Sequence, residues 1–178
     1  MQPKEILIFK NIEFLRQGRE LIARLDDGLY CASVPPLSQS GVGVHFRHCL
    51  DYYRCFLAGL PSRRIDYDAR LRDPQLETDR RIGMERIDQL SQQLHSAAEL
   101  DADLRLLISV DNPAGEHRDL LWSPSTLMRE LQSLISHTVH HYALIAMLLR
   151  SRGCEPDPEF GVAPSTLEHW REVATCSG

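Results

Sequence analysis

The sequence predicts an all-α protein, an antiparallel four-helix bundle with a small β-hairpin before the last long helix. Four stretches carry apolar residues at helical spacing, and segments rich in proline, glycine or serine separate them. One short stretch instead alternates apolar and polar residues around a turn, as a hairpin does. The chain has 178 residues, of which 43% are apolar. This length suits one domain over residues 1–178, with a short tail over 154–178.

The first two helices are predicted from apolar stripes that end at glycine. Residues 4–27 form the first helix, and Gly28 after two aspartates is its expected C-terminal stop. Proline and serine then predict a loop over residues 31–40. Residues 39–58 form the second helix, which Gly59 ends. The stripe residues are Ile8, Ile12, Leu15, Ile22 and Leu25 in the first helix, and Val44, Phe46, Leu50, Tyr53, Phe56 and Leu57 in the second.

The middle of the chain changes pattern twice. Residues 60–77 are expected to be irregular because their apolar residues are sparse. Residues 78–100 form the third helix, with Thr78 as its N-cap; its stripe is Ile82, Ile87, Leu90 and Leu94. Residues 104–122 form the hairpin. Its alternating residues are Leu106, Ile108 and Val110, its turn is 111–115, and its returning strand is 118–122.

The fourth helix has the most regular pattern in the sequence. Ser123 can cap it, Pro124 suits its first position, and Gly153 ends it. Its stripe is Leu127, Leu131, Leu134, His141, Ile145 and Leu148. In the tail, Ser165 begins a capping-box pattern, which predicts a short helical turn that Trp170 could dock against the rest.

Charge and composition argue against several classes of partner. The net charge is -5 and the pI is about 5.9. The arginines of residues 63–86 are interleaved with acidic residues, so no nucleic-acid partner is expected. No apolar run approaches the ~20 residues that span a bilayer, and the first residues lack signal-peptide features. The cysteines indicate reduced thiols and a cytoplasmic protein, because their number is odd and their spacing is not that of a disulfide framework. They are Cys31, Cys49, Cys55, Cys154 and Cys176.

Three histidines form the candidate metal site. His137 and His141 lie four residues apart in the fourth helix, so their side chains share one face about one turn apart. This is the spacing with which a helix offers two imidazoles to one metal ion. Their place within a leucine stripe points them inward, where unpartnered imidazoles are costly. With His48 of the second helix as third ligand, the sequence predicts a divalent metal, and zinc, nickel, manganese and iron remain open.

Other residues near these histidines leave alternatives open. His45 could replace His48 as the third ligand if the second helix is rotated. His45 and His140 are otherwise candidates to support the ligands from outside, as are the carboxylates Asp51 and Glu130, which could accept a hydrogen bond from a ligand imidazole. No residue is singled out as catalytic. The simplest alternative is that the histidines only pack in the core.

Four short stretches are similar to segments of a known family. Val44-His45-Phe46-Arg47-His48 resembles a motif whose second histidine binds metal. His137-Thr138-Val139-His140-His141 resembles one whose first and last histidines bind it. Residues 160–166 and 65–70 look like segments found in one branch of that family. The chain therefore resembles the DinB-like (YfiT-like) family of metal-dependent four-helix-bundle proteins.

The resemblance implies a metal site of His48, His137 and His141, a homodimer, and a small-molecule substrate. Relatives with assigned activities use the metal to activate a low-molecular-weight thiol for S-transfer, or to hydrolyse an amide. The chain departs from the family at Thr138, where many members carry an acidic residue. From the activities of these relatives, we expect a metal-dependent thiol S-transferase. The alternatives are a metal-dependent amide or ester hydrolase and a non-catalytic metal-binding module.

Overall fold

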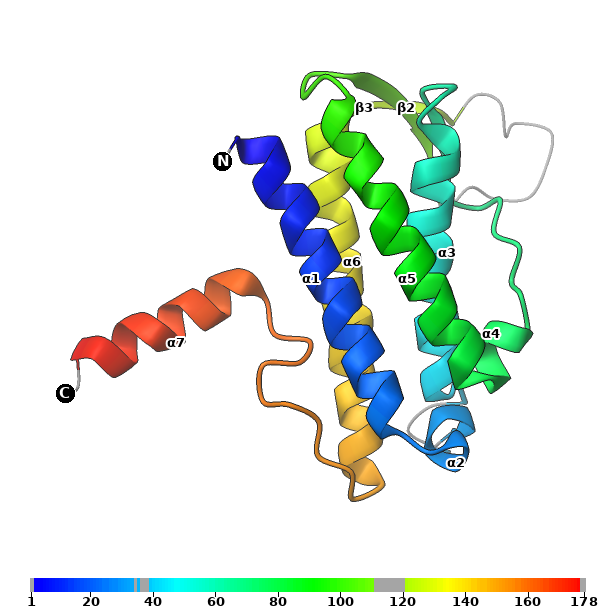
Figure 1. Ribbon diagram of the computed structural model, residues 1–178, viewed down its shortest axis with the longest axis vertical. Helices are drawn as coiled ribbons and strands as arrows, with labels where there is room; N and C mark the ends of the chain where they lie inside the picture. Colours follow the sequence, from blue (N-terminus) through cyan, green and yellow to red (C-terminus); the bar gives the residue numbers. More distant parts are fainter. Residues whose placement is uncertain (1, 34, 36–38, 111–120, 177–178) are drawn as a thin grey trace.

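The protein is mostly helical, with a small three-stranded sheet (Figure 1). The structure is a computed structural model that describes residues 2–33, 35, 39–110 and 121–176. The helices are α1 (Pro3–Arg24), α2 (Asp27–Cys31), α3 (Val42–Gly59), α4 (Gln75–Thr78), α5 (Arg80–Ser96), the 3-10 helix η1 (Ala97–Glu99), α6 (Leu127–Ser151) and α7 (Pro164–Cys176). The strands are β1 (Arg64–Asp66), β2 (Arg105–Ser109) and β3 (Ser123–Thr126). The coarse prediction of a helical protein with a short paired segment is confirmed.

The long helices α1, α3, α5 and α6 lie side by side (Figure 1). Helix α1 contacts α5 and α6, and α3 contacts the same two helices from the other side. The colours of Figure 1 show that α1 and α6 run in one direction and that α3 and α5 run in the other. Two of the four contacts, α1 with α5 and α3 with α6, are therefore antiparallel, and the other two are parallel.

This arrangement explains the long connection between α3 and α5. Because these two helices run in the same direction, the chain must return along their length before α5 begins. Residues 60–79 make this return, and they carry β1 at one end and α4 at the other. Strand β1 pairs in parallel with β2, and β2 pairs antiparallel with β3. The sheet thus covers the end of the long helices where α3 ends and α6 begins (Figure 1).

A buried polar network joins α1, α3 and α6 within the apolar core. The Asn11 amide donates to the carbonyl oxygen of Leu131 over 3.0 Å, and its own oxygen accepts from the Tyr53 hydroxyl over 2.9 Å. The Thr138 hydroxyl lies 3.2 Å from that of Tyr53 and donates to Leu134 O over 2.8 Å. All three polar side chains are fully buried. Such a network is satisfied in only one relative placement of the helices, so it fixes how α3 lies against α6.

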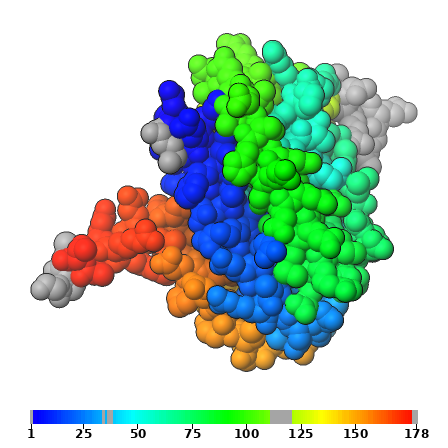
Figure 2. All heavy atoms as spheres, viewed as in Figure 1, coloured from blue at the N-terminus to red at the C-terminus, as the bar shows by residue number. Residues whose placement is uncertain are grey.

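Helix α7 stands away from the long helices. It projects to one side of the molecule in both Figure 1 and Figure 2. It has 13 residues, so the tail forms a longer helix than the predicted short turn. Ser165 lies inside it, after Pro164, and not before its first turn. Trp170 is half exposed.

Several predicted boundaries are wrong in the first half of the chain, each because a local cap was assigned to the wrong helix. Gly28 does not end the first helix. Helix α1 ends at Arg24, and the Asp26 carboxylate accepts from the backbone N–H of Leu29 to begin α2. Likewise, Thr78 belongs to α4, and the side chain of Asp79 caps α5.

The hairpin and the start of the fourth helix also differ from prediction. Strand β2 lies where the sequence predicts it, but its antiparallel partner in the described part of the chain is Ser123–Thr126, and residues 121 and 122 of the predicted returning strand belong to no strand. The predicted turn at 111–115 and residues 118–120 lie outside the described residues. Because Ser123 and Pro124 belong to β3, helix α6 begins at Leu127, and the Thr126 hydroxyl caps it by accepting from the Arg129 N–H over 3.2 Å.

No helix in the described part of the chain combines the length and the apolar character that crossing a bilayer requires.

The cap of α6 gives a test of this boundary. We expect Thr126→Ala to lower the free energy of unfolding by about 1 kcal/mol, because the N–H of Arg129 loses its acceptor. Ser123→Ala, at the cap position expected from the sequence, should change it by less than about 0.5 kcal/mol, since Ser123 is exposed. Urea unfolding of both variants and the wild type measures this. A larger loss in Ser123→Ala than in Thr126→Ala would contradict the assigned helix start.

Candidate metal centre

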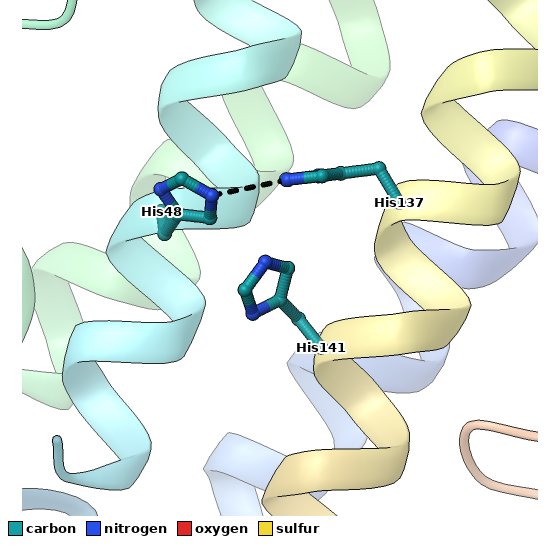
Figure 3. A group of neighbouring side chains, drawn as sticks. All are labelled: His48, His137 and His141. Carbon is teal, nitrogen blue, oxygen red and sulfur yellow. Dashed lines mark hydrogen bonds between the residues drawn. The ribbon is translucent and has the colours of Figure 1, made fainter. Parts of the chain in front are cut away.

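Three histidines from two helices converge on one point. His48 comes from α3, and His137 and His141 come from successive turns of α6. One ring nitrogen of each lies within 4.8 Å of the others. Figure 3 shows the three rings turned toward one another across the space between the two helices. Each histidine is half-buried, so the cluster lies within the protein but is reachable from solvent.

The Nε2 atoms face the centre of this cluster. His137 Nε2 lies 3.0 Å from His48 Nε2. His141 makes its other contact through Nδ1, which lies 3.0 Å from Nδ1 of His45, and its Nε2 points toward the other two rings (Figure 3). Neutral imidazoles bind metals through a ring nitrogen that carries no hydrogen. The cluster therefore presents three donor atoms of the same chemical type to one position.

The environment keeps these rings neutral. Burial is the main cause in each case. It lowers the pKa of His48 to about 4, with help from the charges of Arg70 and Arg47. The pKa of His137 falls to about 3 and that of His141 to about 2, and in both cases the neighbouring histidines add to the effect of burial. At neutral pH all three therefore have the neutral charge state that a metal ligand requires.

A stack of aromatic rings flanks the cluster. The ring of Tyr52 lies parallel to that of His137, with their centres 3.8 Å apart. On its other side, Tyr52 stacks on Tyr67 with the ring centres 4.8 Å apart. The Tyr67 hydroxyl donates to a carboxylate oxygen of Glu130 over 2.9 Å, and the Ser125 hydroxyl donates to the other oxygen over 2.5 Å. The stack fixes the orientation of His137 and connects it to the sheet end of α6.

The predicted supporting residues take different places. His48, and not His45, belongs to the cluster; His45 lies behind His141 and contacts its Nδ1. His140 is exposed, and its ring meets that of His141 edge to face with the ring centres 5.0 Å apart. Asp51 and Glu130 do not accept from a ligand imidazole among the described contacts. The Asp51 carboxylate pairs with Arg47 over 3.1 Å, and Glu130 accepts from Tyr67 and Ser125, as described above.

Sequence reasoning did not identify Tyr52, Tyr67 and Arg70 as site residues. Tyr52 lies one turn after His48 on α3, so the helical spacing alone could have predicted that the two side chains are neighbours. Tyr67 and Arg70 come from the connection after β1, within the 65–70 stretch that carries part of the family resemblance. No spacing rule places a loop residue beside a helix that is distant in sequence. Cys49 and Cys55 are buried without a disulfide, and neither belongs to the cluster.

Thr138 lies between the two histidines of α6 in sequence, but its side chain does not face the histidine cluster. It follows His137 in α6, so its side chain points about 100° away around the helix. There it is fully buried and takes part in the network with Tyr53. Thr138 therefore supports the contact between α3 and α6 from a different face of α6 than the one that carries His137 and His141.

The comparisons with known proteins give one partial similarity. No protein-family model matches the chain, and no solved structure matches it. The chain is similar to FK506-binding protein 5 of Rhizopus delemar, with 31% identity over 105 residues. This match covers 59% of the chain but only 27% of that protein. The fold and the site therefore define the protein as a mostly helical chain with a three-histidine cluster, and a match of this extent does not assign it to a family.

The histidines fit a divalent metal by their chemistry. Three neutral nitrogen donors, two on one helix and one on its neighbour, are a common ligand set for zinc and for other first-row metals. Three protein ligands leave at least one coordination position for water or substrate, which is the arrangement of catalytic sites. Contact between His45 and Nδ1 of His141 would hold that ring in the tautomer that ligates through Nε2.

The lowered pKa values predict how the metal-free protein responds to acid. Between about pH 6.5 and pH 4, the unfolded chain protonates histidines that the folded protein keeps neutral. The unfolded state then binds more protons, so the free energy of unfolding falls as the pH falls through this window. Urea unfolding in the presence of a chelator, at several values in this range, measures the slope.

A variant carrying both His137→Gln and His141→Gln is the control for this prediction. It should show a clearly shallower loss of stability over the same range, because two of the titrating groups are absent. Equal slopes in the variant and in the wild type would contradict the assignment.

Proposed function

We propose that the protein is a metal-dependent enzyme of the DinB-like (YfiT-like) kind, in which His48, His137 and His141 hold a divalent metal. The proposed activity is the transfer of a low-molecular-weight thiol to an electrophile. The single observation that carries the proposal is the convergence of three half-buried ring nitrogens, from α3 and α6, within 4.8 Å. Packing alone leaves a polar atom unsatisfied, because in the described part of the chain His137 Nδ1 is buried without a hydrogen-bond partner.

The fold supports the same proposal. Four long helices lie side by side, and the histidines project from two of them toward each other (Figures 1 and 3). We infer that these helices form a four-helix bundle of the DinB type, with a metal site built from inward side chains on facing helices. The two histidine stretches that resemble family motifs supply all three ligands. The resemblance also implies a homodimer.

The chemistry proposed for the site is thiol activation. A divalent metal bound there would lower the pKa of a coordinated thiol, so that the thiolate forms at neutral pH. Two neighbouring side chains orient the proposed ligands: His45 contacts His141, and Tyr52 stacks on the ring of His137. In the transfer, the thiol gives up its proton, its sulfur forms a bond to the electrophilic carbon, and the leaving group departs with the electron pair of the broken bond.

Metal content tests the first half of the proposal. We expect the untagged wild-type protein to bind close to one equivalent of zinc, nickel or manganese, and His48→Ala, His137→Ala and His141→Ala each to lose it. His140→Ala is the matched control, because this histidine is adjacent to a proposed ligand but exposed; it should retain the metal. Elemental analysis after gel filtration gives the stoichiometry. A wild-type protein that takes up none of these metals would remove the basis of the proposal.

Turnover tests the second half. With a thiol and a chromogenic electrophile, we expect kcat/KM to fall by roughly a hundredfold or more in His141→Ala relative to His140→Ala, since the thiol loses its activating metal. Stopped-flow absorbance follows the product. Unchanged turnover in His141→Ala would exclude S-transfer at this site. Metal-dependent hydrolysis of a model amide in thiol-free buffer would instead support the hydrolase alternative.

A further inference from the structure

Arg70 lies at the edge of the histidine cluster. It belongs to the connection between β1 and α4. Its Nη1 lies 2.9 Å from Nδ1 of His48, and its guanidinium carbon lies 5.6 Å from the ring centre of Tyr52. It therefore touches one proposed metal ligand and approaches the ring that stacks on another.

Among the described residues, no carboxylate lies within ion-pair distance of Arg70. Arg47, the other arginine that lowers the pKa of His48, pairs with Asp51 over 3.1 Å and with Glu77 over 2.7 Å. Arg54, nearby on α3, lies 3.7 Å from Asp51. In the described part of the chain, no carboxylate pairs with Arg70, and its Nε is buried without a hydrogen-bond partner. A half-buried guanidinium normally acquires an anionic partner, because desolvating an unpaired charge is costly.

The contact with His48 is incompatible with metal binding. Arginine can only donate, so Nδ1 of His48 must accept, and a neutral ring then carries its hydrogen on Nε2. A metal at Nε2 takes that lone pair and leaves the hydrogen on Nδ1. Two donors would then face each other at 2.9 Å. Arg70 must therefore release His48 when the metal binds, and its guanidinium becomes available at the edge of the loaded site.

We propose that Arg70 binds a carboxylate of the small molecule that the site accepts. The proposal rests on the function proposed above and adds the chemical class of the ligand: a short thiol that carries a carboxylate a few bonds from its sulfur. The sulfur would lie on the Nε2 side of His48, and the carboxylate would lie at the outer edge of that ring, within reach of Arg70.

The number of cations favours a carboxylate over a phosphate. Arg47 and Arg54 are already engaged with Asp51, so of these three arginines of the described chain Arg70 is the one left to balance a negative charge. The two lysines of the chain, Lys4 and Lys10, both lie in α1, away from the connection that carries Arg70. The planar fork of one guanidinium matches a carboxylate through two parallel hydrogen bonds, whereas phosphate sites usually combine several donors.

Thiol binding to the cobalt-substituted protein tests the proposal without turnover. The probes are 3-mercaptopropionate and its neutral isostere 3-mercaptopropionamide, and the readout is the sulfur-to-cobalt charge-transfer absorption. We expect the wild type to bind the carboxylate roughly tenfold more tightly than the amide, as one charge-assisted pair would give. Arg70→Met should abolish this preference, and Arg70→Lys should retain part of it. Arg72→Met is the control, since Arg72 is exposed on the same connection, and should keep the full preference.

Metal affinity in the absence of thiol gives a second readout. If Arg70 must leave His48 on loading, Arg70→Met should bind cobalt several-fold more tightly than the wild type, because neither the hydrogen bond nor the positive charge opposes the metal. A residue that only positions His48 would give the opposite result, a weaker affinity.

The outcomes separate this inference from the proposed function. Failure of the wild type to take up cobalt would overturn both. Normal cobalt uptake with an unchanged carboxylate preference in Arg70→Met would overturn only the role of Arg70. Tighter binding of 2-mercaptoethyl phosphate than of 3-mercaptopropionate would overturn the carboxylate class.

Discussion

The placement of α3 against α6 is the constraint on which the rest of the site depends. On one side of this contact, the hydroxyls of Tyr53 and Thr138 lie 3.2 Å apart in the buried core. On the other side, the Nε2 atoms of His48 and His137 lie 3.0 Å apart. A slip of one helical turn would move α6 by about 5.4 Å, break the buried pair and separate the histidines. The same packing therefore determines both the core and the geometry of the cluster.

The histidine cluster is costly in the absence of a metal, and the surrounding structure offsets that cost. Burial and the neighbouring histidines lower the pKa values of His137 and His141. Protonating either ring in the folded protein therefore costs free energy. Within the described residues, the Nδ1 of His137 is buried without a hydrogen-bond partner. Stacking on Tyr52 and the network around Asn11 hold α3 and α6 in this arrangement. A metal at the Nε2 atoms would add coordination bonds that the unfolded chain lacks, so binding would be coupled to stability.

The sequence predicted what depends on periodicity and missed what depends on tertiary contacts. The three histidines were found because two share a helical face, and because the third lies in a second amphipathic stretch that resembles a family motif. The caps were misplaced at Ser123 and Thr78, since several residues of the capping type stand next to one another and only the fold decides which one ends a helix. Strand β1 was missed because three residues carry no readable alternation, and its pairing with β2 joins residues more than forty positions apart.

The directions of the helices, which periodicity cannot give, decide what surrounds the cluster. Because α3 and α5 run in the same direction, the chain must return along the molecule between them (Figure 1). This return connection carries Tyr67 into the aromatic stack and Arg70 to the edge of His48. The proposed metal ligands thus come from two packed helices, while the groups that would meet a substrate come from a connection of irregular structure. Loops of this kind tolerate sequence change better than packed helices do. Proteins that share the histidines could therefore differ in the molecules they accept through residues of this connection alone.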